Sequence, residues 1–361
     1  MKVPFNALQL TDDAADVRAA IDRVIASGWF VLGPEVEAFE AEFARASGVA
    51  HAVGVGNGTD AIALILRALD IGPGDEVITA PLSAAFSAFG IMLAGARPVF
   101  ADIDPDRLTL DPRAAEAAIT PRTRAIMPVH LYGQAADMAA FEAIAAKHCL
   151  ALVEDAAQSQ LATAAGKPIG TFGIAAATSF YPTKNLGALG DGGAVLTNDA
   201  QMAARITRLR NGGQTARYQH QEAGANSRLD EIQAAILRAR LHYLPAWTRT
   251  RRAIARRYRA GIANPSVTIP TEFDAGHVYH LFPVLTEHRE RFRAHMAAAG
   301  VETLIHYPVP IPRQPALSDS SSAVCDVADR ICRQVVSLPM YPALGDDAVA
   351  AVIDATTAFR P

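Results

Sequence analysis

Short apolar runs alternate with helical patterns of hydrophobic residues between Val53 and Thr197. Such runs are typical of buried strands, and the segments between them are long enough for helices that connect parallel strands. The pattern therefore predicts an α/β fold with a mostly parallel sheet that is covered by helices on both faces. The predicted strands are residues 76–79, 98–101, 125–129, 150–153, 177–180 and 194–197.

Two of the intervening helices have clear sequence signals. Asp111 is followed by Pro112, which is typical of an N-cap residue followed by proline at the first helical position. In residues 137–148, alanines together with Phe141 and Ile144 form one apolar face. This segment is therefore predicted to be an amphipathic helix that packs on the sheet.

The pattern changes after Asn226, where a long helix is predicted from Leu229 to Tyr243. Because proline interrupts helices, we expect a break near Pro245 and a second helix through Thr248 to Arg259. This stretch is interpreted as a connector between two parts of the chain.

A second, smaller unit is predicted beyond the connector. It contains a strand at residues 278–285 and helices at residues 289–299 and 323–335. We therefore expect two domains. Residues 1–245 form an N-terminal segment and a large domain, and residues 246–361 form the connector helix and a small C-terminal α+β domain.

The composition argues against several classes of protein. Of the 361 residues, 50% are hydrophobic and 19% are charged, without a long uninterrupted apolar run, so we expect a soluble globular chain that does not span a membrane. The formal net charge is only −4. The dense basic stretch from Arg249 to Arg259 lacks aromatic spacing suited to stacking on bases, so nucleic acid is not expected as a partner. We interpret this stretch as a solvated helix face, with assistance to a diphosphate as the alternative.

The cysteines and the first residues bear on location. Cys149, Cys325 and Cys332 are odd in number and scattered, so the sequence predicts neither a disulfide framework nor a metal site. The N-terminus reaches Asp12 and Asp13 without a hydrophobic signal core. We therefore expect a protein of the reducing cytoplasm.

A glycine-rich motif at residues 56–60, GNGTD, lies between an apolar strand at residues 52–55 and a helix. Free backbone N–H groups and the dipole at a helix start favour a bound phosphate. An N-cap role for Thr59 explains the same motif equally well. Both interpretations remain open on this motif alone.

An aspartate and a glutamine, Asp155 and Gln158, follow the predicted strand at residues 150–153. In open α/β sheets, ligands bind at the carboxyl ends of the strands. Such a position favours a ligand-binding role, and capping of the next turn by Asp155 is the alternative.

A lysine, Lys184, follows the predicted strand at residues 177–180 in a loop that proline and glycine bound, close to Ser179. A lysine in apolar surroundings is kept partly neutral and can attack an aldehyde, and a serine hydroxyl can bind phosphate. The loop is therefore a candidate for covalent catalysis rather than a solvated surface segment.

Together these segments resemble the DegT/DnrJ/EryC1/StrS family of sugar aminotransferases, which depend on pyridoxal 5'-phosphate (PLP). The resemblance covers nearly the whole chain and implies fold type I, the aspartate-aminotransferase-like fold, with a large and a small domain. Further matching stretches are residues 95–104 (GARPVFADID), 128–134 (PVHLYGQ), 224–233 (GANSRLDEIQ) and 303–308 (TLIHYP).

The resemblance assigns roles to individual residues. It implies that Lys184 forms the Schiff base with PLP, that Asp155 pairs with the ring nitrogen, and that Gln158 lies on the side of the ring's phenolic oxygen. No residue is assigned to stacking on the ring, because Ala84 stands where many relatives carry an aromatic residue, and Phe86 is equally well explained as a core residue. The phosphate would be bound by the backbone of Gly58, Thr59 and Asp60, by Ser179, and by Asn226 of the partner subunit. A homodimer with shared active sites is therefore implied.

The substrates also follow from the resemblance. Residues 226–231, NSRLDE, are similar to those of members that aminate C3 of a 3-keto-6-deoxy sugar nucleotide, whereas members acting at C4 tend to have a tyrosine after the asparagine. An amino acid such as glutamate would be the donor. Tyr218, His306 and Tyr307 would lie near the sugar nucleotide, with packing beneath the small domain as the alternative for Tyr307. Arg313 departs from the family pattern, in which histidine is frequent there.

Three alternatives to amination at C3 are kept. The first is the same reaction at C4 of the sugar. The second is a PLP-dependent dehydratase of the same family, against which the intact Lys184 argues, since dehydratases replace this lysine. The third is a regulatory protein that binds PLP or a sugar nucleotide without catalysis, which would leave Lys184, Asp155 and Ser179 without a purpose.

Overall fold

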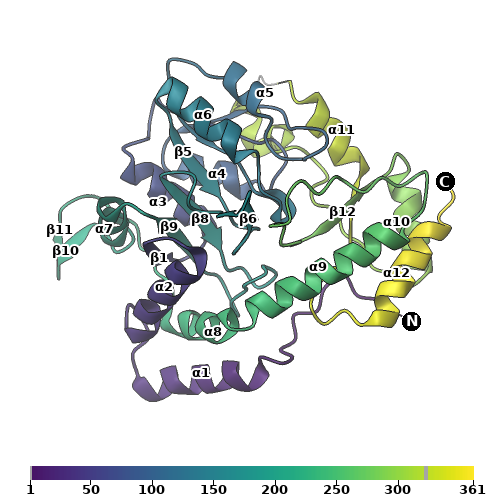
Figure 1. The fold of residues 1–361 in the computed structure, drawn as a ribbon. Helices are drawn as coiled ribbons and strands as arrows, with labels where there is room; N and C mark the ends of the chain where they lie inside the picture. Colours follow the sequence, from purple (N-terminus) through teal and green to yellow (C-terminus); the bar gives the residue numbers. More distant parts are fainter. Residues whose placement is uncertain (1, 321–323) are drawn as a thin grey trace.

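The computed structural model describes residues 2–320 and 324–361, which form an α/β fold around one large sheet (Figure 1). Its seven strands have the order β1-β9-β8-β5-β4-β2-β3. The strands are β1 (His51–Val55), β2 (Glu76–Thr79), β3 (Arg97–Phe100), β4 (Thr123–Met127), β5 (Ala151–Asp155), β8 (Ala175–Ser179) and β9 (Gly193–Thr197). The predicted strands are therefore confirmed, with ends shifted by a few residues.

The sheet is mostly parallel, as the sequence predicts. Strands β3, β2, β4, β5 and β8 run parallel to their neighbours, whereas β9 is antiparallel to both β8 and β1. The loop of residues 180–192 between β8 and β9 contains no helix. The chain therefore returns directly beside β8 in the opposite direction, and the Lys184 loop lies at the sheet edge.

Alternate side chains of the strands enter two different cores. Val77 and Val153 belong to one core, whereas their chain neighbours Ile78 and Leu152 belong to the other. This arrangement follows from strand geometry, in which successive side chains point to opposite faces. The first core is covered by α3 (Gly58–Ala68) and α7 (Ala200–Leu209), and the second by α2 (Pro34–Ser47), α6 (Met138–His148) and α8 (Glu231–Leu241).

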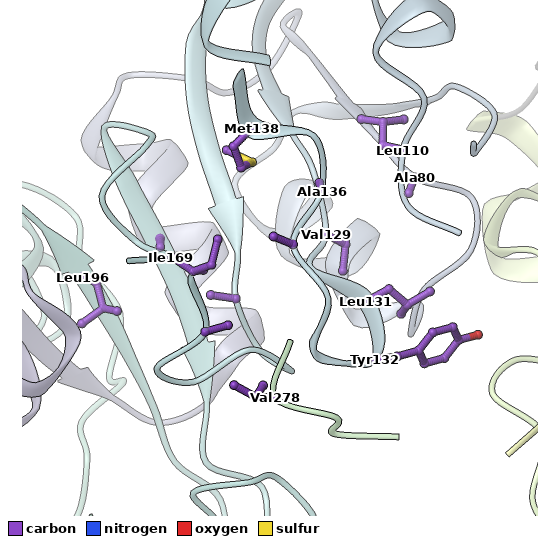
Figure 2. Close-up of a cluster of buried hydrophobic side chains, with 14 of the residues drawn as sticks. Ala80, Leu110, Val129, Leu131, Tyr132, Ala136, Met138, Ile169, Leu196 and Val278 are labelled. Atoms are coloured by element: carbon purple, nitrogen blue, oxygen red, sulfur yellow. The ribbon is translucent and has the colours of Figure 1, made fainter. Parts of the chain in front are cut away.

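The second core extends to the carboxyl edge of the sheet, which carries the candidate site. Figure 2 shows part of it, with Val129 and Leu131 from the chain beyond β4 and Val278 from the C-terminal half. Tyr132 lies at the rim of this cluster and its hydroxyl points away from it. The edge residues are therefore supported by a packed apolar layer.

The predicted helix starts are confirmed. Asp111 accepts a hydrogen bond from the Arg113 N–H (2.8 Å) at the start of α5 (Pro112–Ala117), and Asp137 accepts one from the Ala140 N–H (3.2 Å) at the start of α6. The helices not predicted from the sequence include α1 (Ala14–Ser27), α2 and α4 (Phe86–Leu93).

The connector differs from the prediction. It consists of α8 and of α9 (Leu244–Gly261), so Pro245 lies in the first turn of α9 instead of before it. Proline is tolerated there because the first N–H groups of a helix have no acceptor within the helix.

The predicted solvated face at residues 249–259 is wrong for Arg251. This residue is 5% exposed, and its guanidinium donates to the backbone carbonyls of Tyr279 (3.2 Å), His280 (3.3 Å) and Met340 (2.7 Å). Burial lowers the Arg251 pKa to about 10. The arginine therefore ties α9 to two other segments of the C-terminal half.

The C-terminal half pairs β12 (Phe282–Leu285) with β13 (Val335–Leu338) and carries α10 (Arg289–Ala298), α11 (Asp326–Gln334) and α12 (Asp346–Ala358). The predicted strand at 278–285 is shorter than expected. The predicted helix at 323–335 ends one residue early, because Val335 starts β13, and its residue 323 lies outside the described residues. We propose that the domain boundary at residue 245 holds, since a separate core joins α9 to residues 267–359.

The remaining short strands are β6 (Thr163–Ala164) with β7 (Lys167–Pro168) and β10 (Gln214–Ala216) with β11 (Gln219–His220). The second pair projects from the body of the chain near α7 (Figure 1). Across the two described ranges, no helix has the length and apolar character needed to cross a membrane.

Candidate active site

Neighbouring strands bring Asp155 and Ser179 to the same edge of the sheet. Asp155 is the last residue of β5 and Ser179 the last of β8, and β5 pairs with β8 in parallel. Parallel strands share the edge at which they end, so residues far apart in sequence meet there. The Asp155 side chain is 3% exposed, and its environment is therefore determined by the protein.

The start of α3 offers two free backbone N–H groups. Asn57, and not Thr59, is the N-cap residue, and its side chain accepts a hydrogen bond from the Asp60 N–H (2.8 Å). In the described part of the chain, the N–H groups of Gly58 and Thr59 have no acceptor. The predicted anion site therefore has two backbone donors, since the expected third, Asp60, is already bonded.

Ser179 lies beside these N–H groups on the neighbouring element. A Cβ atom placed on Gly58 would lie 2.9 Å from the Cβ of Ser179, so the start of α3 touches the end of β8. The Ser179 hydroxyl oxygen accepts from the Tyr181 N–H (3.3 Å), which leaves its hydrogen free to donate. Gln160 donates to the Ser179 carbonyl (2.6 Å) and holds this residue in place.

The lysine of the β8–β9 loop, Lys184, has the properties of a nucleophilic amine. Burial lowers the pKa of its ammonium to about 8, although the negative charge of Asp155 acts in the opposite direction. The Lys184 backbone N–H donates to the Tyr181 carbonyl (2.8 Å), which closes a turn directly after Ser179. The effect of Asp155 on this pKa indicates that the two side chains lie close enough for their charges to interact.

Gln158 links the site to the C-terminal half. Its side-chain oxygen accepts from the Tyr132 N–H (2.7 Å), and its amide donates to the hydroxyl of Tyr307 (3.2 Å). The Tyr132 hydroxyl in turn donates to the His306 carbonyl. Burial raises the Tyr307 pKa to about 12, so this phenol stays neutral. Burial, together with Lys184, lowers the His306 pKa to about 4.

A buried pair next to Asp155 escaped the sequence analysis. Glu154 accepts from the His130 ring (3.1 Å) and from the N–H groups of Gly170 (2.9 Å) and Gly173 (2.9 Å). Burial opposes ionisation of Glu154, but these donors outweigh it and lower its pKa. The His130 N–H donates to the Asp155 carbonyl (3.0 Å), so the pair fixes the backbone that carries Asp155. The sequence gives only a weak sign of this pair: His130 follows the predicted strand at residues 125–129, and Glu154 follows the predicted strand at residues 150–153.

Comparison with known proteins decides the family. Residues 11–357 match the DegT/DnrJ/EryC1/StrS aminotransferase family. The chain belongs to this family. The predictions of the family, of the fold and of an aminotransferase are thereby confirmed.

Three similar proteins illustrate the relationship. A "dTDP-3-amino-3,4,6-trideoxy-alpha-D-glucose transaminase" of Streptomyces venezuelae is 48% identical over 360 residues, which span 98% of this chain and 95% of that protein. The "Erythromycin biosynthesis sensory transduction protein EryC1" of Saccharopolyspora erythraea is 46% identical and the match covers 98% of both chains. The crystal structure of "S. venezuelae DesV in complex with ketimine intermediate" has a TM-score of 0.96 and 47% identity, with 99% of this chain and 98% of that chain covered.

Two of the residues that the family resemblance assigns do not join the site within one chain. Tyr218 is 79% exposed in the turn between β10 and β11, where it contacts Arg217. Asn226 is also exposed, and its side chain makes no hydrogen bond to the site in the described residues. The next residue, Ser227, donates to the Asp60 carboxylate (2.6 Å). The family's expected contribution of Asn226 and Tyr218 therefore requires a second chain or a rearrangement.

The structure also bears on the two departures from the family pattern. Phe86 is 63% exposed and packs against Phe89, so it is not a fully buried core residue. Arg313 forms an ion pair with Asp329 (2.9 Å). The Arg313 guanidinium is therefore held in an ion pair, at a position where histidine is frequent in the family pattern.

Proposed function

We propose that this chain is a PLP-dependent aminotransferase that moves the amino group of an amino acid, with glutamate as the expected donor, to C3 of a nucleotide-linked keto-deoxysugar. The observation that carries the proposal is the pairing of an amine of lowered pKa, Lys184, with the buried carboxylate of Asp155. Perturbed titratable groups at a strand edge are typical of catalytic sites.

The residues present fit PLP. The two free N–H groups of Gly58 and Thr59, with the Ser179 hydroxyl, suit a phosphate dianion at a helix start. Asp155 suits a protonated ring nitrogen, and Gln158 suits the phenolic oxygen side. When bound, PLP supplies an electron sink that stabilises the negative charge left when a proton leaves carbon.

Lys184 and Asp155 have separable tasks in this proposal. The neutral form of the Lys184 amine, which a pKa of about 8 makes available near neutral pH, would hold PLP through its aldehyde carbon, with the aldehyde oxygen leaving as water. Once the amino donor takes its place, the same amine would accept the proton from the donor's α-carbon and give it to the cofactor carbon on the other side of the transferred nitrogen. Asp155 would accept a hydrogen bond from a protonated ring nitrogen.

The choice of C3 rests on two supports. The sequence NSRLDE at residues 226–231 is similar to that of members acting at C3. The transaminase of Streptomyces venezuelae, at 48% identity, is named for a 3-amino sugar nucleotide. Lys184 is close enough to His306 to lower its pKa, and both His306 and Tyr307 are partly buried, so we assign these two residues to the sugar nucleotide.

We further propose a homodimer in which each site receives Asn226 and Tyr218 from the partner subunit. Both side chains are exposed and lie on segments after α7, and the loop between α1 and α2 exposes Trp29 (56%), Phe30 (54%) and Val31 (41%). Consecutive exposed apolar residues are typical of an interface between chains. A dimer whose interface covers residues 29–31 would bring the segments that carry Asn226 and Tyr218 to the partner subunit.

The decisive experiment converts the purified protein to its pyridoxamine form and adds 3-keto and 4-keto sugar nucleotides one at a time. Return of the absorbance of the aldehyde form identifies an accepted substrate. We expect it with 3-keto compounds, and a response to 4-keto compounds alone would move the reaction to C4.

A regulatory role is the second candidate, favoured by one observation: the EryC1 relative at 46% identity is named a sensory transduction protein. The same experiment separates the two functions. A protein that binds a sugar nucleotide but never regains the aldehyde absorbance would be a binding protein without catalysis.

A further inference from the structure

A serine on α4, Ser87, contacts the carboxylate that the family resemblance assigns to the ring nitrogen. Its hydroxyl donates to Oδ2 of Asp155 (2.7 Å), and the other carboxylate oxygen, Oδ1, accepts from the Ala157 N–H (3.1 Å). Ser87 is 3% exposed. Each oxygen of the carboxylate therefore has one protein donor, and these two donors fix the plane of the group.

A second serine extends this contact. The hydroxyl oxygens of Ser83 and Ser87 lie 3.1 Å apart, and Ser83 is 5% exposed. Because the single hydroxyl hydrogen of Ser87 is given to Asp155, Ser83 must donate to Ser87. The result is a directed chain of hydrogen bonds from Ser83 through Ser87 to the carboxylate, in which each bond polarises the next.

The surroundings of Ser87 favour an apolar residue. Its neighbours on α4, Ala88 and Ile91, are buried in the hydrophobic cores. A buried hydroxyl costs free energy unless it is hydrogen-bonded, so a serine here is accounted for by its bond to the carboxylate. The exposed neighbour Phe86 makes no such contact, because successive helix residues point in different directions.

We propose that Ser87 is a positioning residue that acts through Asp155 on the nitrogen of the PLP ring, and that Ser83 supports it. This inference rests on the proposed function, since it requires that PLP binds with its ring nitrogen at Asp155. Without Ser87, the carboxylate keeps only the Ala157 N–H as a donor and is free to turn away from the ring.

The test compares two cofactors in one variant. Apoenzyme of the wild type and of Ser87→Ala is titrated with PLP and with the PLP analogue that has carbon in place of the ring nitrogen, and the dissociation constants are measured from the visible absorbance. We expect Ser87→Ala to weaken PLP binding about tenfold but to weaken binding of the carbon analogue less than about twofold, because the analogue has no nitrogen for Asp155 to bind. Equal weakening of both cofactors, or no weakening, would overturn the proposal.

Matched variants separate positioning from loss of packing. Ser47→Ala removes another buried hydroxyl, one that has no hydrogen-bond partner, and should leave both dissociation constants unchanged. Ser87→Thr keeps the hydroxyl and should stay within about twofold of the wild type for PLP. Ser83→Ala should weaken PLP binding about threefold and the analogue not at all, and it carries the test if Ser87→Ala does not fold.

A failure of the proposed function is recognised separately. Wild-type protein that binds neither cofactor would refute PLP dependence itself. If the wild-type protein binds PLP and Ser87→Ala binds both cofactors as tightly as the wild type does, only the role of Ser87 is refuted.

Discussion

Gly58 at the start of α3 lies directly against Ser179 at the end of β8. A Cβ atom on Gly58 would be 2.9 Å from the Cβ of Ser179 and 3.4 Å from the Thr178 carbonyl oxygen. No real side chain tolerates the shorter distance without a shift. The glycine therefore permits the contact that places two free N–H groups beside a serine hydroxyl.

The first prediction follows from this contact. Gly58→Ala should push α3 and β8 apart and weaken PLP binding by at least about tenfold, because the phosphate donors separate. Equilibrium titration of apoenzyme measures it. Gly74→Ala controls for the general cost of a glycine substitution. Gly74 is exposed and has positive φ, and a Cβ atom there would have no neighbour within 4 Å. Equal losses of PLP binding in the two variants would contradict the role of Gly58.

The second prediction concerns the lysine. Purified wild-type protein should be yellow, and Lys184→Ala should not hold PLP covalently, since its amine is the nucleophile. Borohydride reduction followed by mass mapping identifies the modified residue. Reduced cofactor on Lys147 or Lys167, which instead form surface ion pairs with Glu116 and Glu142, would show that the site is assigned wrongly.

The third prediction concerns pH. A Lys184 pKa lowered to about 8 makes roughly a tenth of the amine neutral at pH 7 and most of it neutral at pH 9. The rate at which apoenzyme captures PLP should therefore rise about tenfold between these pH values and then level off. Stopped-flow absorbance measures this rate. A rate that still rises steeply above pH 10 would indicate a lysine with an ordinary pKa.

The fourth prediction concerns the carboxylate. Asp155→Asn keeps the shape of the side chain but removes the charge that holds a proton on the ring nitrogen. A nearby anion commonly shifts a pKa by one to three units, so we expect turnover to fall at least about a hundredfold. Steady-state kinetics measures turnover, with circular dichroism as the check on folding. Near-normal turnover would refute the role of Asp155.

The fifth prediction concerns the shared site. Lys184→Ala and Asn226→Asp chains should each be inactive, the second because its carboxylate repels the phosphate. In a mixed dimer, one site contains both the intact lysine and the intact asparagine, since they come from different chains. Random exchange makes about half of the dimers mixed, so activity should return to roughly a quarter of the wild-type value.

Native mass spectrometry provides the control for this experiment by showing that subunits exchange. Exchange without recovered activity would place Asn226 in the site of its own chain, near the contact of Ser227 with Asp60, or outside the site.

Much of the large sheet and part of the site follow from local sequence. Apolar runs such as residues 76–79 and 125–129 predict strands, because buried parallel strands leave a continuous hydrophobic signal. Asp155 and Ser179 lie at the ends of two further strands, β5 and β8, and strands that run parallel must end at one edge. The strand pattern alone therefore implies that Asp155 and Ser179 lie near each other.

Other features depend on packing between distant segments. The sequence predicts Val335 as the last residue of a helix, whereas this residue starts β13, whose partner β12 lies far along the chain. Arg251 belongs to an arginine-rich helix that looks solvated, and only the three carbonyls around it explain its burial.

The sequence by itself determined most strands of the large sheet and the candidate residues near their ends, Lys184, Asp155 and Ser179, since both depend on residue type and local periodicity. Only the tertiary structure decided which donors surround Asp155 and which N–H groups stay free at the start of α3. A hydrogen bond such as that from Ser87 to Asp155 joins residues 68 positions apart. Its formation depends on how a helix and a strand pack, which no local pattern records.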